Sequence, residues 1–246
     1  MSYHHTVPSA PVRRFFVAIG LWCLLLTIVG FVPNVSRQWA GELSYPPLVH
    51  LHALIMLTWL VLFTTQANLM AGGKLQQHRT LGWLATVWAV IVWISMAVGT
   101  VEALLRYSPD TFGFLVQPLL IQLGTIIVFP IIVTVAIFAR RHPEWHKRFM
   151  MFATFSLVQP ALDRMHWLPN EGLPMFWHAG LRLYVLAVLP VVVYDLLTLR
   201  RIHPATLSAS AILVTLHAII SVYWDDSGWN HSARAFWTWL RALNIG

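Results

Sequence analysis

Residues 112–139 read FGFLVQPLLIQLGTIIVFPIIVTVAIFA, and Arg140 and Arg141 follow directly. The stretch contains no charged residue, and a helix needs about 20 predominantly apolar residues to cross a hydrocarbon core about 30 Å thick. It therefore predicts a transmembrane helix, and the two arginines mark where this helix reaches a membrane surface.

Similar apolar runs fill most of the chain, which has 246 residues. They predict an all-α integral membrane protein, a seven-transmembrane-helix bundle that forms a single membrane domain over residues 1–246. The predicted spans are 15–32, 47–70, 80–101, 112–139, 148–162, 174–199 and 205–224. The fifth run is short for a span, and residues 225–246 are too polar for one. We expect this last segment to be an amphipathic tail on the outer surface.

The composition supports a lipid bilayer as the surrounding medium. Hydrophobic residues make up 58% of the chain, charged residues only 10%, and the mean hydropathy is +0.66. A soluble domain carries about 25% charged residues. The net charge of +7 comes from short basic clusters between apolar runs, so we expect no nucleic-acid partner. The single cysteine, Cys23, excludes an intramolecular disulfide.

The distribution of charge predicts the orientation. Every second connection is basic, and acidic residues occupy the connections between them; the basic ones include Arg13, Arg14, Lys74, Arg79, Arg140, Arg141, Lys147, Arg148, Arg200 and Arg201. Basic loops stay in the cytoplasm. We therefore expect a bacterial inner (plasma) membrane protein with a cytoplasmic N-terminus and an external C-terminus.

A weak internal repeat is present. Residues 78–86, HRTLGWLAT, resemble residues 146–154, HKRFMMFAT. The repeat predicts that His78 and His146 lie at equivalent positions in two helices, and that three helical hairpins follow the first helix.

Several short motifs carry a resemblance to known proteins. The segment from His52 to Gly82 contains His-x3-Met-x2-Trp, Gln66 and His-Arg-x-Leu-Gly, and a Trp-His-Lys-Arg-x-Met motif follows at Trp145 with Arg164 beyond it. Over roughly residues 48–204 these motifs resemble a family of uncharacterised bacterial multi-pass membrane proteins, known only as a domain of unknown function. That resemblance implies a helical bundle and no particular chemistry. The first motif is also similar to the transmembrane cytochromes b of the ascorbate-reducible type.

Four histidines from different predicted helices lie at similar outer depth: His52, His166, His178 and His217. Imidazole ligates iron, copper and zinc, and two histidines from facing helices can hold haem. We therefore expect His52, His178 and His217 to bind a cofactor, haem b or a transition-metal ion, with His52 facing His217 and with His166 as a further ligand of a metal ion. The expected supporting residues are Asp163, Gln66 and Arg182. The alternatives are helix packing for the histidines and an ion pair with Arg164 or Arg182 for Asp163.

The inner histidines His78, His142, His146 and His203 fit interfacial positions better. A ligand role for His78 and His146 would require both rings to turn into the bundle. Asp195, close to Arg200 and Arg201, is expected to anchor a salt bridge.

Three functions remain open. The first is a haem- or metal-binding electron-transfer protein with a membrane redox partner or a homo-oligomeric assembly. The second is a non-enzymatic transporter, chaperone or accessory subunit with structural histidines. The third is a seven-helix zinc hydrolase. The sequence contains no Gly-rich phosphate loop and no His-Glu-x-x-His or Gly-x-Ser-x-Gly motif.

Overall fold

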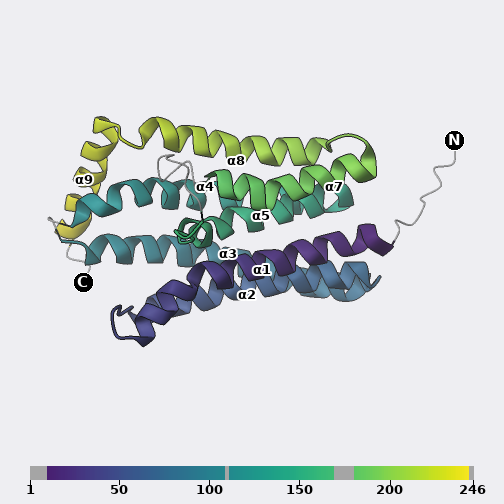
Figure 1. Cartoon of the computed structure of the whole chain (residues 1–246), viewed down its shortest axis with the longest axis horizontal. Coiled ribbons are helices and arrows are strands. Elements are labelled where there is room, and N and C mark those ends of the chain that lie inside the picture. Colours follow the sequence, from purple (N-terminus) through teal and green to yellow (C-terminus); the bar gives the residue numbers. More distant parts are fainter. Residues whose placement is uncertain (1–9, 109–110, 169–179, 244–246) are drawn as a thin grey trace.

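The computed structural model describes residues 10–108, 111–168 and 180–243, and these residues form helices and no strands. Two 3-10 turns, Phe112–Leu115 and Ala139–Arg141, flank α4, and a π-helical segment, Tyr184–Val188, precedes α7. The helices are α1 (Ala10–Trp39), α2 (Pro47–Ala71), α3 (Leu75–Arg106), α4 (Val116–Phe138), α5 (Pro143–Asp163), α7 (Leu189–Leu199), α8 (Pro204–Tyr223) and α9 (Ser227–Ala242). Figure 1 shows an elongated bundle in which the long helices run side by side.

Six helical segments of the described chain are long and apolar enough to cross a membrane: Arg14–Trp39, Pro47–Ala71, Leu75–Arg106, Val116–Arg141, Gly180–Leu199 and Pro204–Tyr223. Each overlaps one of the apolar runs predicted from the sequence, although residues 174–179 of the sixth run lie outside the described residues. The chain is therefore a multi-pass helical membrane protein.

The remaining predicted span, 148–162, lies within α5, which does not meet the same criterion of length and apolarity. This helix packs against α1, α4 and α8, and most of its side chains from Arg148 to Leu162 are buried. Because protein surrounds α5, it does not need the apolar surface that a helix facing lipid needs. Six helices thus have the character of membrane spans, and the predicted count of seven depends on α5.

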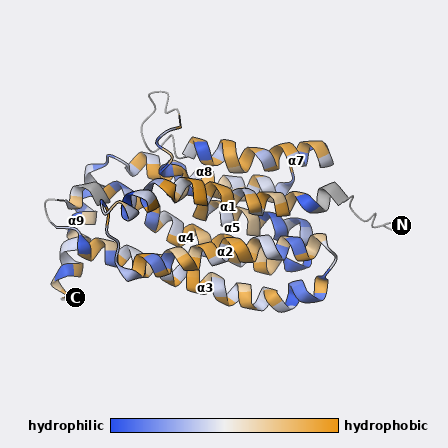
Figure 2. Cartoon of the chain, turned by 60° about the horizontal axis from the view of Figure 1, so that its bottom comes forward, coloured by the Kyte–Doolittle hydropathy of each residue, from blue (hydrophilic) through white to orange (hydrophobic). Residues whose placement is uncertain are grey.

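The outward faces of the other helices are strongly apolar. Phe138, Trp83, Leu197 and Val222 are between 73% and 80% exposed. Figure 2 shows the hydrophobic colour along the middle of the helices and hydrophilic residues mainly toward their ends. A large exposed apolar surface of this kind suits contact with lipid tails.

Glycines allow α1 to approach its neighbours closely. A Cβ atom at Gly30 would lie 2.3 Å from the carbonyl oxygen of Ala161 on α5. At Gly20, a Cβ atom would lie 2.5 Å from the hydroxyl oxygen of Thr64 on α2. Small residues at such contacts are a general device for packing helices in membranes.

The two ends of the bundle differ. At one end, which we call the basic end, lie the start of α1 and the α2–α3, α4–α5 and α7–α8 connections, with Arg14, Lys74, Arg140 and Arg200 (Figure 1). Contacts tie these connections together: Lys147 Nζ lies 4.7 Å from the ring centre of Phe16, and the Trp145 and His203 rings are 5.9 Å apart. The opposite end, which we call the α9 end, carries α9.

Helix α9 occupies residues for which an amphipathic surface segment was predicted. Ala233, Trp237 and Leu240 are buried on one side of it, whereas Phe236 and Trp239 are exposed. The buried side joins a small cluster with Leu104 of α3 and Val116 of α4, and other residues. The indole Nε1 of Trp237 donates to the Leu104 carbonyl at 2.8 Å. Thus α9 caps the ends of α3 and α4.

Candidate functional site

The histidine expected on α2 contacts α3. The Nδ1 atom of His52 lies 3.2 Å from the hydroxyl oxygen of Ser95, and the ring lies beside Gly99, where a Cβ would be 4.0 Å from Nδ1. His52 is partly buried. Its described polar contact therefore lies between α2 and α3.

The histidine expected on α8 is buried and contacts the segment before α7. The Nδ1 atom of His217 lies 2.8 Å from the carbonyl oxygen of Leu213 and 3.0 Å from the hydroxyl of Tyr184. Gly180 brings the neighbouring backbone close, since a Cβ atom there would lie 3.3 Å from the His217 ring. In the described part of the chain no contact joins His217 to His52.

The other residues predicted for the outer group are dispersed. His166 follows the end of α5 and is exposed, and His178 lies outside the described residues. Gln66 is fourteen residues from His52 along α2, about 21 Å at 1.5 Å per residue. Gln66 lies beside Gly82 near the start of α3, at the basic end, and so is remote from His52. Across residues 10–108, 111–168 and 180–243, no group of three or more His, Cys, Asp or Glu side chains is arranged to hold a metal ion.

A different polar group lies where α5 ends. Three buried atoms there have no hydrogen-bond partner among the described residues: Gln159 Nε2, Asp163 Oδ1 and Arg182 Nε. Gln159 and Asp163 are one turn apart on α5 and share a face. The guanidinium of Arg182 reaches the same helix end, because its Nη1 donates to the Leu162 carbonyl at 3.0 Å. We call Gln159, Asp163 and Arg182 the α5-terminal group.

The ion pairs that the sequence allowed for Asp163 do not form. Neither Arg164 nor Arg182 lies within ion-pair distance of its carboxylate, in the part of the chain that the structure describes. Arg164 instead donates to the Pro160 carbonyl at 2.6 Å and lies 4.6 Å from the ring centre of Phe31. The second guanidinium nitrogen of Arg182 donates to the Leu168 carbonyl at 3.3 Å. Asp163 therefore keeps an acceptor free for another partner.

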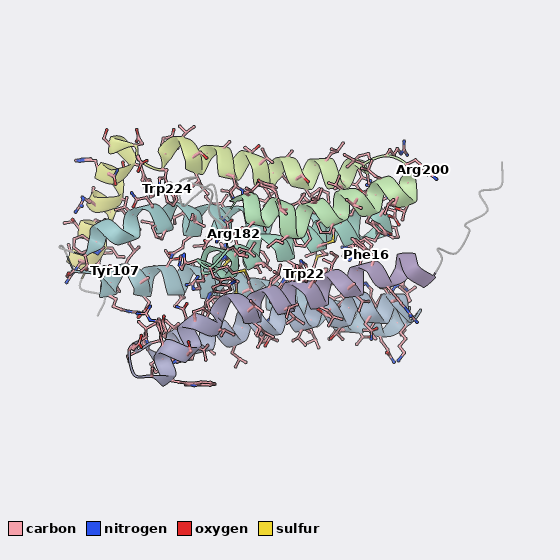
Figure 3. All side chains as sticks on the ribbon, viewed as in Figure 1. Phe16, Trp22, Tyr107, Arg182, Arg200 and Trp224 are labelled. Atoms are coloured by element: carbon pink, nitrogen blue, oxygen red, sulfur yellow. The ribbon has the colours of Figure 1, made fainter. Side chains whose placement is uncertain are left out.

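The group lies within the bundle and not at one of its ends. Figure 3 places Arg182 between Arg200 at the basic end and Tyr107 at the α9 end. Near this group α5 ends at Asp163, and the helix described from Gly180 onward is π-helical over Tyr184–Val188. Irregular backbone at membrane depth is tolerated where it is buried in protein or lines a polar cavity, and π-helical turns occur often at functional sites.

The basic end holds a second buried polar network, and here the polar groups are paired. Arg148 and Asp195 are fully buried and form an ion pair that joins α5 to α7. The Nε atom of Arg148 also donates to the Thr206 hydroxyl at 3.2 Å, and Thr206 donates to Asp195 at 2.5 Å. Glu144 accepts from Arg148 Nη1 at 2.5 Å. Asp195 is thus a salt-bridge anchor, as predicted, but its partner is Arg148 and not Arg200 or Arg201.

His203 closes this network at the start of α8. Its backbone N–H donates to Asp195 at 3.0 Å, and its Nδ1 accepts from the Ala205 N–H at 3.0 Å as a helix cap. Burial lowers the pKa of His203 below its ordinary value, and the charge of Arg148 lowers it further. A neutral ring is what the cap needs, because a protonated Nδ1 cannot accept a hydrogen bond.

The inner histidines of the repeat lie close together. His78 and His146 are each the fourth residue of their helices, α3 and α5, as the repeat predicted. Their ring centres are 6.3 Å apart. Both rings therefore turn into the bundle, which is the condition that a shared ligand role requires.

Sequence reasoning missed several residues of these sites, among them Tyr184 and Arg148. Tyr184 gave no signal, because one tyrosine in an apolar run looks like a packing residue. Arg148 did give a signal: an arginine four residues after Glu144 at the start of an apolar run needs a buried partner. No protein family, curated protein or solved structure matches the chain. The function must follow from the chain's own geometry.

Proposed function

We propose that the chain is a carrier for a small polar solute and crosses the membrane seven times, with α5 as the central span. Six helices supply the apolar spans, and α5, with 21 residues, has about the length that a span requires. On the positive-inside rule the basic end faces the cytoplasm. This arrangement encloses a polar helix inside an apolar shell.

One observation carries the proposal, the unpaired polar atoms of the α5-terminal group. Leaving a buried polar group without a partner costs roughly 2–7 kcal/mol, depending on the reference state. Ionisable residues inside a membrane bundle usually line the path of a substrate or ion. The π-helical segment that begins two residues after Arg182 is an irregularity of the kind that membrane helices carry at binding sites in secondary transporters.

The atoms define the chemistry of the solute. Gln159 Nε2 and Arg182 Nε are donors, and Asp163 Oδ1 is an acceptor. A matching solute carries at least one acceptor, such as a carboxylate, and at least one donor, such as an ammonium or hydroxyl group. A small zwitterion or a hydroxy acid meets both requirements, whereas an apolar solute meets neither.

The redox alternative has less support from this geometry. His52 and His217 have polar contacts with Ser95 and Tyr184 on neighbouring segments. Haem ligation would need two imidazoles from facing helices. Binding of haem b or a metal ion by His52, His178 and His217 therefore stays a prediction, which a visible spectrum of the purified chain tests.

The carrier proposal is tested by ligand-dependent stabilisation of the full chain in detergent. Small zwitterions, hydroxy acids, simple cations and simple anions would be compared as separate classes. We expect one of the first two classes to raise the melting temperature, and Asp163→Asn or Arg182→Gln to abolish the rise. Glu42→Gln is the matched control, since Glu42 is exposed near the α1–α2 connection.

Two outcomes would overturn the proposal. One is that no class stabilises the chain, or that stabilisation survives both substitutions. The other is a Soret band that disappears in His52→Ala or His217→Ala, which would restore the electron-transfer function.

A further inference from the structure

Three polar side chains from three helices converge at the basic end, remote from the α5-terminal group. His78 lies on α3 and His146 on α5, with their ring centres 6.3 Å apart and their planes at 81°. Gln66 of α2 reaches the same turn of α3, because its Nε2 atom lies 3.6 Å from the position of a Cβ on Gly82. Gly82 is four residues after His78 and therefore shares its helix face.

Each of the three side chains offers an acceptor atom. The Nδ1 atom of His146 lies 2.8 Å from the Ala136 carbonyl oxygen. A carbonyl can only accept, so Nδ1 carries the proton and Nε2 keeps its lone pair. In the described part of the chain, the buried atoms His78 Nδ1 and Gln66 Oε1 have no hydrogen-bond partner. Two imidazole nitrogens and one amide oxygen are thus available to an electrophile.

The hydrogen bond of His146 has a further meaning. Histidines that ligate metals almost always donate their other ring N–H to a carbonyl or a carboxylate, which fixes the tautomer and makes the ligating nitrogen more basic. His146 is held in this way by Ala136, which is fully buried on α4. The ring is therefore oriented before any ligand arrives.

The rings lie close to the separation that a single ion between them requires. With a nitrogen–zinc distance of about 2.0–2.1 Å, two imidazoles on one tetrahedral ion have ring centres roughly 5 Å apart. The observed 6.3 Å is wider by about 1 Å, so small side-chain rotations are needed to bring both rings onto one ion. Imidazole with an oxygen ligand suits zinc, copper and nickel ions, whereas magnesium and calcium prefer oxygen ligands alone.

We propose that Gln66, His78 and His146 form a binding site for a divalent transition-metal ion of the zinc type, completed by water or an external ligand. The site is independent of the proposed carrier function. The two imidazoles of this site come from the internal repeat, because His78 and His146 occupy the same position in α3 and in α5. It also ties α2, α3 and α5 together at the end where these helices meet a membrane surface.

The test uses the full chain without a polyhistidine tag, in detergent and freed of metal by chelation. His4 and His5 are replaced by Gln in the parent to remove terminal histidines. Titration with Zn²⁺ should give one ion per chain. His78→Gln and His146→Gln should each weaken binding at least tenfold, since loss of even an outer-shell partner costs about 10–100-fold. Gln66→Leu should weaken it less.

Control variants separate this site from other histidines. His231→Gln, on the exposed side of α9, should leave zinc affinity unchanged. Co²⁺ in place of Zn²⁺ gives a visible absorption whose loss in His78→Gln reports directly on coordination. Elution volume and melting temperature of each variant show that the fold is kept, and His78→Gln remains informative if His146→Gln unfolds.

Three results would overturn the proposal. The first is that zinc does not bind, and the second is that zinc binds equally to the parent and to His78→Gln. The third is loss of zinc in His142→Gln with retention in His78→Gln. That result would assign the ion to a surface pair of His142 and His146, which are four residues apart.

Discussion

At the scale of single residues, Arg148 shows how this bundle accommodates charge. The side chain is fully buried, yet each guanidinium nitrogen has an acceptor on Asp195, Thr206 or Glu144. Desolvation of a buried ion pair offsets much of its attraction, so such a pair adds little net stability. Loss of one partner is different, because the other charge is then buried alone.

A double-mutant cycle on Arg148 and Asp195 should show that losing one partner destabilises the fold more than losing both. We expect Arg148→Met and Asp195→Leu each to lower the free energy of unfolding by about 3–5 kcal/mol, and the double substitution to recover a large part of the loss. Unfolding in mixed detergent, followed by circular dichroism, measures all four variants. Additive losses in the double variant would contradict a direct coupling.

His203 should make the basic end sensitive to acid. Its pKa is lowered in the folded chain by burial and by Arg148, and Lys147 lowers it too, whereas Asp195 and Glu144 raise it. When folding lowers the pKa of a histidine, the folded state is stabilised at pH values above the pKa in the unfolded chain, about 6.5. This stabilisation is lost as the pH falls below that value. We expect the melting temperature to drop between about pH 7 and pH 5.

His203→Asn provides the comparison. Asparagine keeps an acceptor for the helix cap but does not titrate. The variant should therefore show a smaller drop in melting temperature over the same pH interval, while His231→Asn should match the parent. An identical drop in His203→Asn and the parent would exclude His203 as the cause.

At the scale of helices, sequence patterns predicted most of what the structure contains. Apolar runs located all six helices that can span a membrane, because burial in lipid demands an uninterrupted run of apolar residues. The starts of α3 and α5 followed from the repeat. The partners of individual polar residues could not be predicted, because the composition of a helix says little about its rotation about its own axis. That rotation decides which neighbouring helix each side chain faces. Asp163 and Asp195 show this most clearly, since neither has the partner that its neighbours in sequence suggested.

The contact between α1 and α5 supplies a prediction at this scale. Gly30→Ala should lower the free energy of unfolding by roughly 1–3 kcal/mol, because the new Cβ would overlap the Ala161 carbonyl, 2.3 Å away. Gly72→Ala is the matched control. Its φ of −84° suits any residue, and its nearest neighbour would lie 3.5 Å away. The prediction fails if the two variants unfold alike.

At the scale of the whole molecule, the charge distribution and the fold agree on two distinct ends. Arg14, Lys74, Arg140 and Arg200 gather at the basic end, while α9 and its exposed aromatic side chains lie at the other (Figure 1). Aromatic rings favour the membrane–water interface. The α9 end is therefore suited to lie among the headgroups at one membrane surface.

Cysteine labelling of intact cells tests this orientation. In a Cys23→Ala background, Ser232→Cys on α9 should react with a membrane-impermeant maleimide, and Lys74→Cys in the α2–α3 connection should react only after the cells are opened. Both positions are exposed, so a difference in reactivity reflects the side of the membrane. Labelling of Lys74→Cys in intact cells would reverse the proposed topology.

The polarity of α5 has a consequence for biogenesis. Glu144 pairs with Arg148 within α5, but the buried carboxylate of Asp195 lies 47 residues downstream of Arg148, and the Thr206 hydroxyl lies 58 residues downstream. When α5 leaves the ribosome, neither partner has been synthesised, and a helix of its composition gains little by entering lipid alone. Its insertion should therefore wait for the later helices. We expect truncated nascent chains that end before α8 to leave α5 outside the membrane, where a protease in the cytoplasm can cleave it. Helix α5 then assembles late, at the centre of a protein whose other helices insert early.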